Sequence, residues 1–212
     1  WRGGTSLSRL EPMIAQVIDD LYDMSFLTEW ESLLLDDIPV YTTNVANPTS
    51  FPNRRTGSHR LLGVDIFART GLNRVDVLHP KASKFFDAFE ILENQVFRDQ
   101  IYLHRIDVNL QFQYQEGTQH TDGASSRDYT VMVMNNTKWK SEWGGQFQML
   151  DSDGHVIEEH EYIPGRVIIF PGDIFHRGLA PTVPYVYRYT TAYRVVMDQD
   201  KVLSYIRTYD KN

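Results

Sequence analysis

The sequence contains no cysteine. This absence excludes disulfides, thiolate nucleophiles, iron–sulfur clusters and cysteine-rich zinc sites, so any metal ligands must come from histidine, aspartate, glutamate or water. Long apolar runs are also absent: no segment reaches the roughly 18 residues of a membrane span, and none resembles a signal peptide. We therefore expect a soluble protein, cytoplasmic by default, that does not act at a membrane.

Basic residues are outnumbered, with 21 Lys and Arg against 28 Asp and Glu and a net charge of -7. A nucleic-acid-binding surface is normally basic, because it neutralises phosphates. The charge balance therefore argues against a nucleic acid as partner. What the chain does contain, 212 residues of which 42% are hydrophobic, is enough for a single domain with a well-buried core.

Before residue 100, apolar residues recur at the three- and four-residue spacing of amphipathic helices. This spacing predicts one helix over 10–21 and another within 79–97. A short helix is also predicted over 26–37, with Thr28 as its N-cap and Pro39 just beyond its end. The apolar positions behind the first and last of these predictions are Leu10, Ile14, Val17, Ile18 and Leu21, and Phe85, Phe89, Leu92 and Val96.

From residue 101 onward the pattern is that of β-strands. Apolar and polar residues alternate strictly from Ile106 to Tyr114, which predicts a strand with one buried face. Turn sequences such as "DSDG" and "FPGD" separate further apolar segments. The additional strands are predicted over 129–135, 145–150, 155–163, 166–170 and 185–196. Many short strands with such turns indicate a β-sandwich or a barrel.

The last of these segments, "YVYRYTTAYRVV", carries two arginines on one face. A strand alternates its side chains, so Arg188, Thr190 and Arg194 share a face and the tyrosines share the other. If the arginine face lines a barrel interior, Arg188 needs an anionic partner. Its planar fork matches a carboxylate, to which the Thr190 hydroxyl adds a further hydrogen bond. The alternative is that the arginines face solvent and the tyrosines face inward.

Three residues have the types and positions of a metal site. His120 and Asp122 follow the alternating strand, and His176 follows the buried-looking segment "RVIIF". Two neutral imidazoles and one carboxylate on one face of an octahedron leave three adjacent positions open, which is the arrangement of non-haem Fe(II) oxygenases. The alternative for His120 and Asp122 alone is a polar turn at the end of a strand.

Several segments together resemble one enzyme family. They are "QYQEGTQHTD", "RDYTVMVMNN", "EWGGQFQML", "IPGRVIIFPGDIFHRG" and "YRYTTAYRV". Over residues 101–196 the chain resembles the Fe(II)/2-oxoglutarate-dependent dioxygenases, in particular their prolyl 4-hydroxylase-like branch. The resemblance implies a mainly β fold, a double-stranded β-helix (jelly roll) with N-terminal helices packed on its outside. It also implies a single dioxygenase domain over 1–212, in which 1–100 supply support and substrate loops and 101–200 form the catalytic core.

The resemblance assigns roles to individual residues. His120, Asp122 and His176 are the expected iron ligands. Arg188 is expected to bind the far carboxylate of 2-oxoglutarate, with Thr190 beside it and Tyr114 as a further hydrogen-bond donor. Prolyl hydroxylases usually carry lysine where this chain has Arg188, so the resemblance supports the iron chemistry more strongly than the prolyl substrate.

The implied reaction is hydroxylation of an unactivated C–H bond with Fe(II), 2-oxoglutarate and O2, and ascorbate as reductant. The expected substrate is peptidyl or free proline or another amino-acid-like small molecule or peptide, and succinate and CO2 are released. The arginine-rich segment "FPNRRTGSHR" (51–60) is either part of the substrate entrance or a solvated surface loop. Two alternatives stay open: a cupin-like metal barrel with other chemistry, and a jelly roll that binds a ligand without catalysis.

Overall fold

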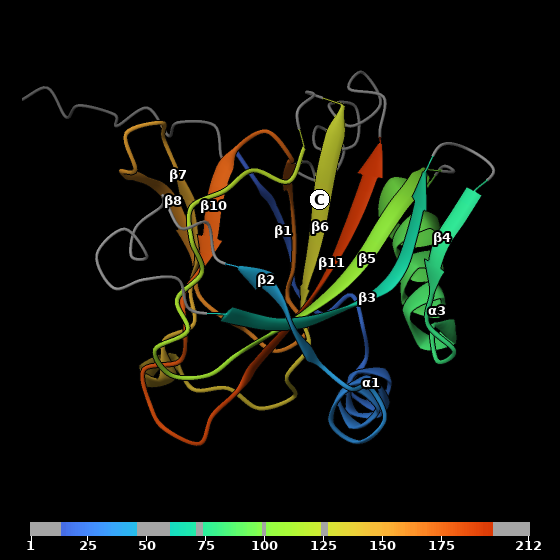
Figure 1. Cartoon of the computed structure of the whole chain (residues 1–212), viewed down its shortest axis with the longest axis horizontal. Helices are drawn as coiled ribbons and strands as arrows, with labels where there is room; N and C mark the ends of the chain where they lie inside the picture. The colour runs from blue at the N-terminus through green and yellow to red at the C-terminus, as the bar shows by residue number, and fades with distance from the viewer. Residues whose placement is uncertain (1–13, 46–59, 71–73, 99–100, 124–126, 197–212) are drawn as a thin grey trace, which may run out of the picture.

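The protein is mainly β and is built from antiparallel sheets, as predicted (Figure 1). The computed structural model describes residues 14–45, 60–70, 74–98, 101–123 and 127–196. The large sheet has the order β1-β9-β6-β11-β5-β3-β2, with β4 paired to β3, and the small sheet has the order β10-β7-β8. The large sheet consists of β1 (Gln16–Ile18), β2 (Tyr41–Val45), β3 (Arg60–Thr70), β4 (Arg74–Leu78), β5 (Tyr102–Gln111), β6 (Asp128–Met134), β9 (Val167–Pro171) and β11 (Arg188–Val196). The small sheet consists of β7 (Phe147–Leu150), β8 (Val156–His160) and β10 (Phe175–Gly178).

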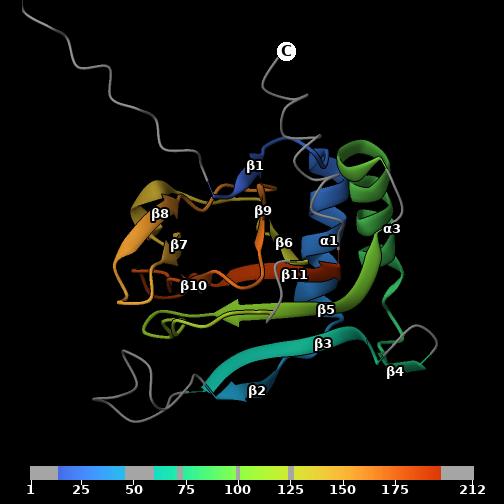
Figure 2. The ribbon, with the colours of Figure 1, turned by 90° about the horizontal axis from the view of Figure 1, so that it is seen from above.

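The central strands of the large sheet are buried on both faces. Along β6, Val131 and Val133 pack into one core with the helices, whereas Met132 and Met134 pack into a second core with residues of the small sheet. One strand contributes to both cores because its side chains alternate between the faces. Figure 1 accordingly shows the helices and the small sheet on opposite sides of the large sheet, and Figure 2 shows the same arrangement from above.

Helix α1 (Met24–Asp36) forms the predicted second helix, but it begins before the predicted cap. Asp23 is the N-cap, and its carboxylate accepts a hydrogen bond of 2.8 Å from the backbone N–H of Phe26. The cap assigned to Thr28 is therefore wrong. Its hydroxyl donates to the Met24 carbonyl at 2.7 Å, one turn back, as hydroxyls within helices do. The helix buries Trp30, which is fully inaccessible to solvent.

The helical pattern within 79–97 is confirmed as α3 (Ser83–Ile91) followed by a π-helical turn, η1 (Leu92–Phe97). Phe85 of α3 contacts Trp30 of α1 edge to face, with 5.7 Å between ring centroids. The hydroxyl of Tyr193, from β11, donates to the carbonyl of Phe85 at 2.9 Å. These contacts pack the two helices against the tyrosine-bearing face of the large sheet.

The helix predicted over 10–21 is wrong for the part that the structure describes. Residues 16–18 form β1 and pair antiparallel with β9, with Gln16 opposite Ile169. β-Branched residues such as Val17 and Ile18 favour strands, and the edge of β9 offers backbone hydrogen-bond partners to a further strand. Residues 10–13 lie outside the described part of the chain.

The strand predicted over 106–114 is present, but it ends earlier. β5 stops at Gln111, and Tyr114 lies in a turn with a positive φ of 70°. The polar face of β5 is not turned to solvent: Asp107 is 6% exposed and Gln111 is 5% exposed. The alternation on β5 therefore separates an apolar face under the helices from a polar face that lines an internal cavity.

The other strands predicted after residue 127 are confirmed as β6, β7, β8, β9 and β11, with bounds that differ by a few residues. β10 is not predicted by the sequence, because it has only 4 residues and "FHRG" shows no alternation. None of the helices in the described ranges has both the length and the apolar character to cross a membrane.

Candidate active site

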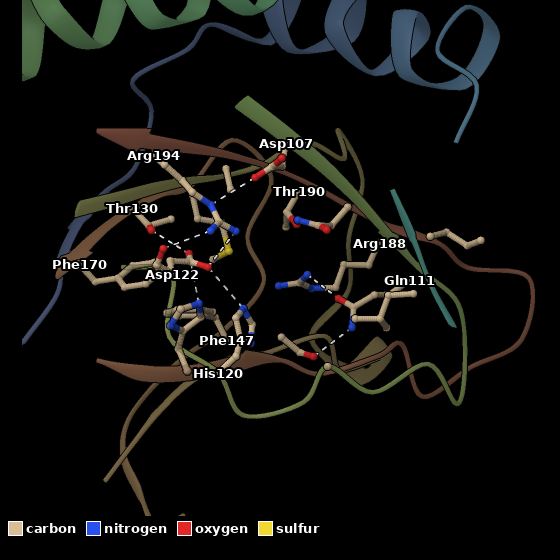
Figure 3. Close-up of a pocket in the computed structure, with 18 residues that line it drawn as sticks. Asp107, Gln111, His120, Asp122, Thr130, Phe147, Phe170, Arg188, Thr190 and Arg194 are labelled. Carbon is tan, nitrogen blue, oxygen red and sulfur yellow. Dashed lines mark hydrogen bonds and ion pairs between the residues drawn. The ribbon is translucent and has the colours of Figure 1, made fainter. Parts of the chain in front are cut away.

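A cavity of about 120 Å³ lies between the polar face of β5 and β11 and the small sheet. Figure 3 shows Arg188 and Gln111 at one end of this cavity and His120 and Asp122 at the other. Thr190 of β11 lies between the two ends and is 3% exposed. The sequence motifs that suggested a metal and an anion therefore meet in one cavity.

The two histidines are brought together by a short backbone bridge. The N–H of His120 donates to the carbonyl of His176 at 3.1 Å, and the N–H of His176 donates back at 2.9 Å. Just before His120, Gly117 lies against Gly178 of β10, where a Cβ would come within 2.6 Å of the Gly178 carbonyl oxygen. Only glycine permits this approach without a backbone shift. The pairing places the 117–122 segment beside the strand that carries His176.

Asp122 completes the group of three side chains. Its carboxylate oxygens lie 3.5 Å from His120 Nε2 and 3.4 Å from His176 Nε2. One potential ligand atom from each residue lies within 4.8 Å of the others. The backbone N–H of Asp122 donates to the Gly172 carbonyl at 2.8 Å, which anchors the turn to the end of β9.

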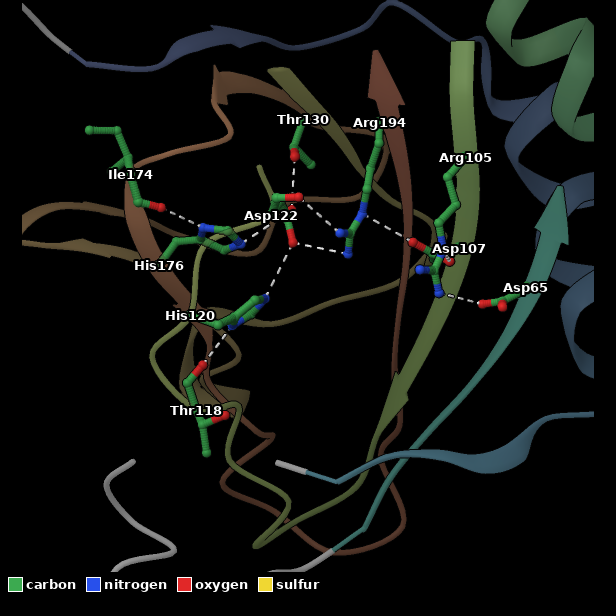
Figure 4. Close-up of polar contacts among 10 residues, drawn as sticks. All are labelled: Asp65, Arg105, Asp107, Thr118, His120, Asp122, Thr130, Ile174, His176 and Arg194. Atoms are coloured by element: carbon green, nitrogen blue, oxygen red, sulfur yellow. Dashed lines mark hydrogen bonds and ion pairs between the residues drawn. The ribbon is translucent and has the colours of Figure 1, made fainter. Parts of the chain in front are cut away.

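Both imidazoles are oriented by backbone carbonyls. His120 Nδ1 lies 2.7 Å from the Thr118 carbonyl, and His176 Nδ1 lies 2.9 Å from the Ile174 carbonyl (Figure 4). A carbonyl can only accept, so each Nδ1 carries a proton and each Nε2 is directed towards Asp122 with a lone pair to offer. This is the tautomer that a metal-binding histidine needs.

The charges of the three residues depend on one another. Burial lowers the pKa of His176. In His120 burial acts in the same direction, but the contact with Asp122 outweighs it and raises the pKa. Burial alone would raise the pKa of Asp122, but the contacts with His120, His176 and Arg194 hold it well below its usual range. Asp122 is therefore an anion at neutral pH.

These residues fit a divalent metal. Asp122 Oδ1 is buried, and no aligned hydrogen-bond donor satisfies it among the described residues, although Arg194 Nη2 lies 2.9 Å away. Two imidazole nitrogens and one carboxylate oxygen are a donor set that suits Fe(II) and leaves coordination positions open. The rings of Phe170 and Phe147 pack beside His176, with centroids 4.7 Å and 5.6 Å away, and shield the histidine from water.

Arg188 occupies the other end of the cavity and is 2% exposed. Its Nε donates to the Gly145 carbonyl at 2.9 Å, and its Nη1 donates to Gln111 Oε1 at 2.8 Å. Nη2 is buried without any hydrogen-bond partner in the described part of the chain. Burial lowers the pKa of Arg188 to about 10, so the side chain remains a cation at neutral pH. A buried cation with an unused donor is a site for an anion.

The loop before β7 holds Arg188 in place. Gly145 has a positive φ of 81°, and a Cβ there would lie 2.7 Å from the Trp139 ring and 3.3 Å from Arg188 Cδ. Glycine is therefore required at this position both for the backbone conformation and for the space. The loop can then present its carbonyl oxygen to the guanidinium.

The interior orientation of β11 is confirmed, and the alternative with solvent-facing arginines is wrong. Arg188, Thr190 and Arg194 line the cavity, whereas Tyr189 and Tyr193 pack into the core beneath the helices. The tyrosines fill the apolar side of the strand because their rings can be buried there with their hydroxyls bonded to helix carbonyls.

The structure does not bring Tyr114 to this cavity. The side chain is 83% exposed, and the positive φ turns the chain away after β5 has ended. The role expected for Tyr114 is therefore wrong, because the alternation that suggested it runs past the end of the strand. Residues 51–59 of the segment expected near the entrance lie outside the described residues.

Several polar residues of the cavity have no role in the sequence-based prediction. Asp107 and Gln111 follow the alternation of β5, which is the signal that could have identified them once the interior face was known. Thr130 donates to Asp122 Oδ2 at 2.8 Å, and Arg194 lies 2.9 Å from Asp122 Oδ1. Burial raises the pKa of Asp107 to about 7, against the opposing effect of the neighbouring arginines.

A second group of possible ligands, Asp151, Asp153 and His155, lies in the turn between β7 and β8. There Asp151 Oδ1 accepts the backbone N–H groups of Asp153 and His155, each at 2.9 Å. These bonds stabilise the turn, and we assign it no metal.

Comparison with known proteins agrees with the site. The family model of the 2OG-Fe(II) oxygenase superfamily matches residues 104–193, a range that contains every residue discussed above as a metal or anion ligand. No curated protein matches the sequence.

Solved structures show the same fold at low sequence identity. The chain is similar to a 2OG-Fe(II) oxygenase family oxidoreductase from Burkholderia pseudomallei, with 14% identity, a TM-score of 0.62, and 86% of this chain and 85% of that chain covered. It is similar to a Pseudomonas putida prolyl-4-hydroxylase, with 14% identity, a TM-score of 0.52, and 87% and 93% covered. It is also similar to the alpha-ketoglutarate-dependent epimerase SnoN of nogalamycin biosynthesis, with 11% identity, a TM-score of 0.56, and 87% and 78% covered.

The matched family, the oxygenase fold and the His-Asp-His group lead to the same assignment. Residues 104–193 match the 2OG-Fe(II) oxygenase superfamily, and this match, the fold and the His-Asp-His group together support an Fe(II)/2-oxoglutarate-dependent dioxygenase.

Proposed function

We propose that the protein hydroxylates an unactivated C–H bond of a prolyl or other amino-acid-like substrate. In this proposal His120, Asp122 and His176 hold Fe(II), and Arg188 binds the far carboxylate of 2-oxoglutarate with Thr190 beside it. Bound iron with 2-oxoglutarate and O2 supplies the oxidising power that removes hydrogen from the substrate, with release of succinate and CO2. Ascorbate is the proposed reductant that keeps the iron ferrous.

One observation carries the proposal: a buried cation with an unused donor shares a cavity with the metal-ligand group. Arg188 Nη2 has no hydrogen-bond partner in the described residues, and Asp122 Oδ1 at the other end of the cavity has none either. A cupin-like barrel with hydrolytic or isomerase chemistry does not need this buried cation. A divalent metal satisfies Asp122 Oδ1, and a metal-chelating molecule with a second carboxylate, such as 2-oxoglutarate, satisfies Arg188.

The protein contributes binding, orientation and exclusion of water. The carbonyls of Thr118 and Ile174 hold the protons on the two imidazole Nδ1 atoms, so both Nε2 atoms are available as ligands. The Phe147 and Phe170 rings keep the region around His176 apolar. A dry cavity strengthens every charged contact within it, including the one proposed for Arg188.

The retained Asp122 favours hydroxylation, because the carboxylate occupies a position that a halogenating site leaves for halide. Solved structures with this fold include prolyl hydroxylases, an epimerase and a carbocyclase. The fold therefore accommodates several outcomes, and the substrate has to be identified by experiment.

The proposal is tested by incubating the iron-loaded protein with 2-oxoglutarate, ascorbate and air in the presence of candidate substrates. Proline-containing peptides, free proline and other free amino acids are compared, and succinate and the mass of each substrate are measured together. We expect succinate formation to rise with one class and that substrate to gain 16 Da. Asp122→Ala is the matched control, which should produce neither signal. Loss of 2 Da instead of the gain would indicate desaturation or ring closure and would contradict the hydroxylase proposal.

A further inference from the structure

The carboxylate of Asp122 is approached by two side chains from adjacent strands. Arg194 of β11 is directly opposite Thr130 of β6 in the sheet register. Thr130 Oγ1 donates to Oδ2 at 2.8 Å, and Arg194 Nη2 lies 2.9 Å from Oδ1 (Figure 4). Each carboxylate oxygen therefore has its own neighbour, one neutral and one cationic.

The contact between Arg194 and Asp122 is an ion pair without hydrogen-bond alignment at the carboxylate. Asp122 Oδ1 has no hydrogen-bond donor within the described ranges, although the guanidinium is close. The aligned hydrogen bond goes elsewhere, from Arg194 Nη1 to the backbone carbonyl of Asp122 at 3.2 Å. The guanidinium thus acts on the carboxylate mainly through its charge.

A chain of alternating charges holds Arg194 in this position. Arg194 Nε lies 3.2 Å from Asp107 Oδ2, Asp107 also pairs with Arg105, and Arg105 Nη2 lies 2.8 Å from Asp65 Oδ1. These residues come from β11, β5 and β3, which are neighbours in the large sheet. The register places Arg194 opposite Arg105, a like-charge pair that is destabilising unless an acid lies between them, as Asp107 does.

We propose that Arg194 is a positioning residue that competes with the metal for Asp122 Oδ1, weakens metal binding and disfavours coordination through both carboxylate oxygens at once. This inference rests on the proposed function, because it assigns Asp122 to the metal. A cation beside one oxygen repels the metal ion and lowers the donor strength of that oxygen. Turnover needs coordination positions for the cosubstrate and O2, and a carboxylate bound through both oxygens would occupy one of them.

Replacement of Arg194 separates this role from a structural one, because the two predict opposite effects on metal affinity. Arg194→Met removes a positive charge beside Asp122 and leaves Asp107 paired with Arg105 alone. Both changes make the cavity more negative, which favours the binding of a divalent ion. We expect Co(II), titrated alone and followed by its visible absorption, to bind the variant roughly tenfold more tightly than wild type. We expect succinate formation with saturating Fe(II) and 2-oxoglutarate to fall by about tenfold or more. A residue that only supports the fold would lower both.

Two further variants make the test specific. Arg194→Lys keeps the charge, and we expect it to return the Co(II) affinity to within about threefold of wild type while turnover stays reduced, because lysine lacks the fork that reaches both carboxylates. Arg166→Met breaks an ion pair with Asp19 outside the cavity, where Nε and Nη2 of Arg166 lie 2.7 and 2.8 Å from the carboxylate. This control should leave both Co(II) affinity and turnover unchanged.

Asp107→Asn keeps the inference testable if Arg194→Met does not fold. At pH 8 this change removes a negative charge from the cavity, and Asp122 becomes the one carboxylate that pairs with Arg194 in the described part of the site. We therefore expect severalfold weaker Co(II) binding. Equal or weaker binding by Arg194→Met, or unchanged binding by Asp107→Asn, overturns the inference while wild-type metal binding upholds the proposed function. A folded wild-type chain that binds no Co(II) overturns both.

Discussion

Replacement of Arg188 should affect 2-oxoglutarate binding far more than it affects the fold. In Arg188→Met the side chain keeps its length and its burial but loses the charge. The guanidinium of the wild type donates to Gly145 and Gln111 and leaves Nη2 without a partner, so the substitution removes hydrogen bonds but also removes a buried charge. Because these effects oppose each other, we expect a melting temperature within a few degrees of wild type without 2-oxoglutarate.

The expected loss of 2-oxoglutarate affinity in Arg188→Met follows from the burial of the proposed contact between Arg188 and the carboxylate. Removal of one partner of a buried charged pair costs about 2–5 kcal/mol of binding free energy, which corresponds to roughly 30-fold to several-thousand-fold weaker binding. Since Thr190 remains beside the site, we take about 100-fold as the expected loss. Arg188→Lys retains a point charge without the planar guanidinium fork, so its affinity for 2-oxoglutarate should lie between those of wild type and Arg188→Met.

Thermal unfolding of the Co(II)-loaded protein provides the assay. At a 2-oxoglutarate concentration of 100 times the wild-type Kd, binding adds about 2.7 kcal/mol to the free energy of unfolding, which raises the melting temperature of a domain of this size by about 5–10 °C. A variant with 100-fold weaker binding would then be half saturated and gain only about 0.4 kcal/mol, or about 1 °C. If Arg188→Met keeps the full wild-type increase, the carboxylate does not bind at Arg188 and the assignment is refuted.

Three other predictions concern the metal, the loop and the core. His176→Ala and Asp122→Ala should each abolish Fe(II)-dependent succinate formation while the far-UV circular dichroism stays that of a folded protein; activity that persists in either variant would exclude that residue as a ligand. Gly145→Ala forces a Cβ against the Trp139 ring and within 3.3 Å of Arg188, so the 2-oxoglutarate KM should rise at least tenfold, which steady-state kinetics would show. Tyr193→Phe removes a buried hydrogen bond to a carbonyl of α3 and should lower the free energy of unfolding by about 1–2 kcal/mol in urea titration with unchanged KM; a shift in KM would mean that the helix contact reaches the cavity.

The sequence was most informative where chemistry and periodicity coincide. On β11, the alternation placed the tyrosines on one face and Arg188 and Arg194 on the other, and the structure then showed that the arginine face lines the cavity. The His-x-Asp pair and His176 could be recognised as one site because their donor types suit a metal, although no local signal predicts the four-residue strand β10 that carries His176.

The errors of prediction have a common physical origin in tertiary context. Residues 16–18 read as part of a helix, but the open edge of β9 draws them into the large sheet. The alternation on β5 continues in the sequence to Tyr114, but the strand ends at Gln111 and a positive φ exposes the tyrosine. The alternation on β5 predicted one buried face, whereas the polar face is buried as well and Asp107 lines the cavity.

The most direct test of the central claim is an anaerobic titration of the Fe(II)-loaded protein with 2-oxoglutarate, followed by visible absorption. We expect an iron-to-keto-acid charge-transfer band that saturates at one 2-oxoglutarate per iron in the wild type and is absent from Asp122→Ala. A folded, iron-loaded wild-type protein that shows no band at saturating 2-oxoglutarate would contradict the assignment of this cavity to iron and 2-oxoglutarate.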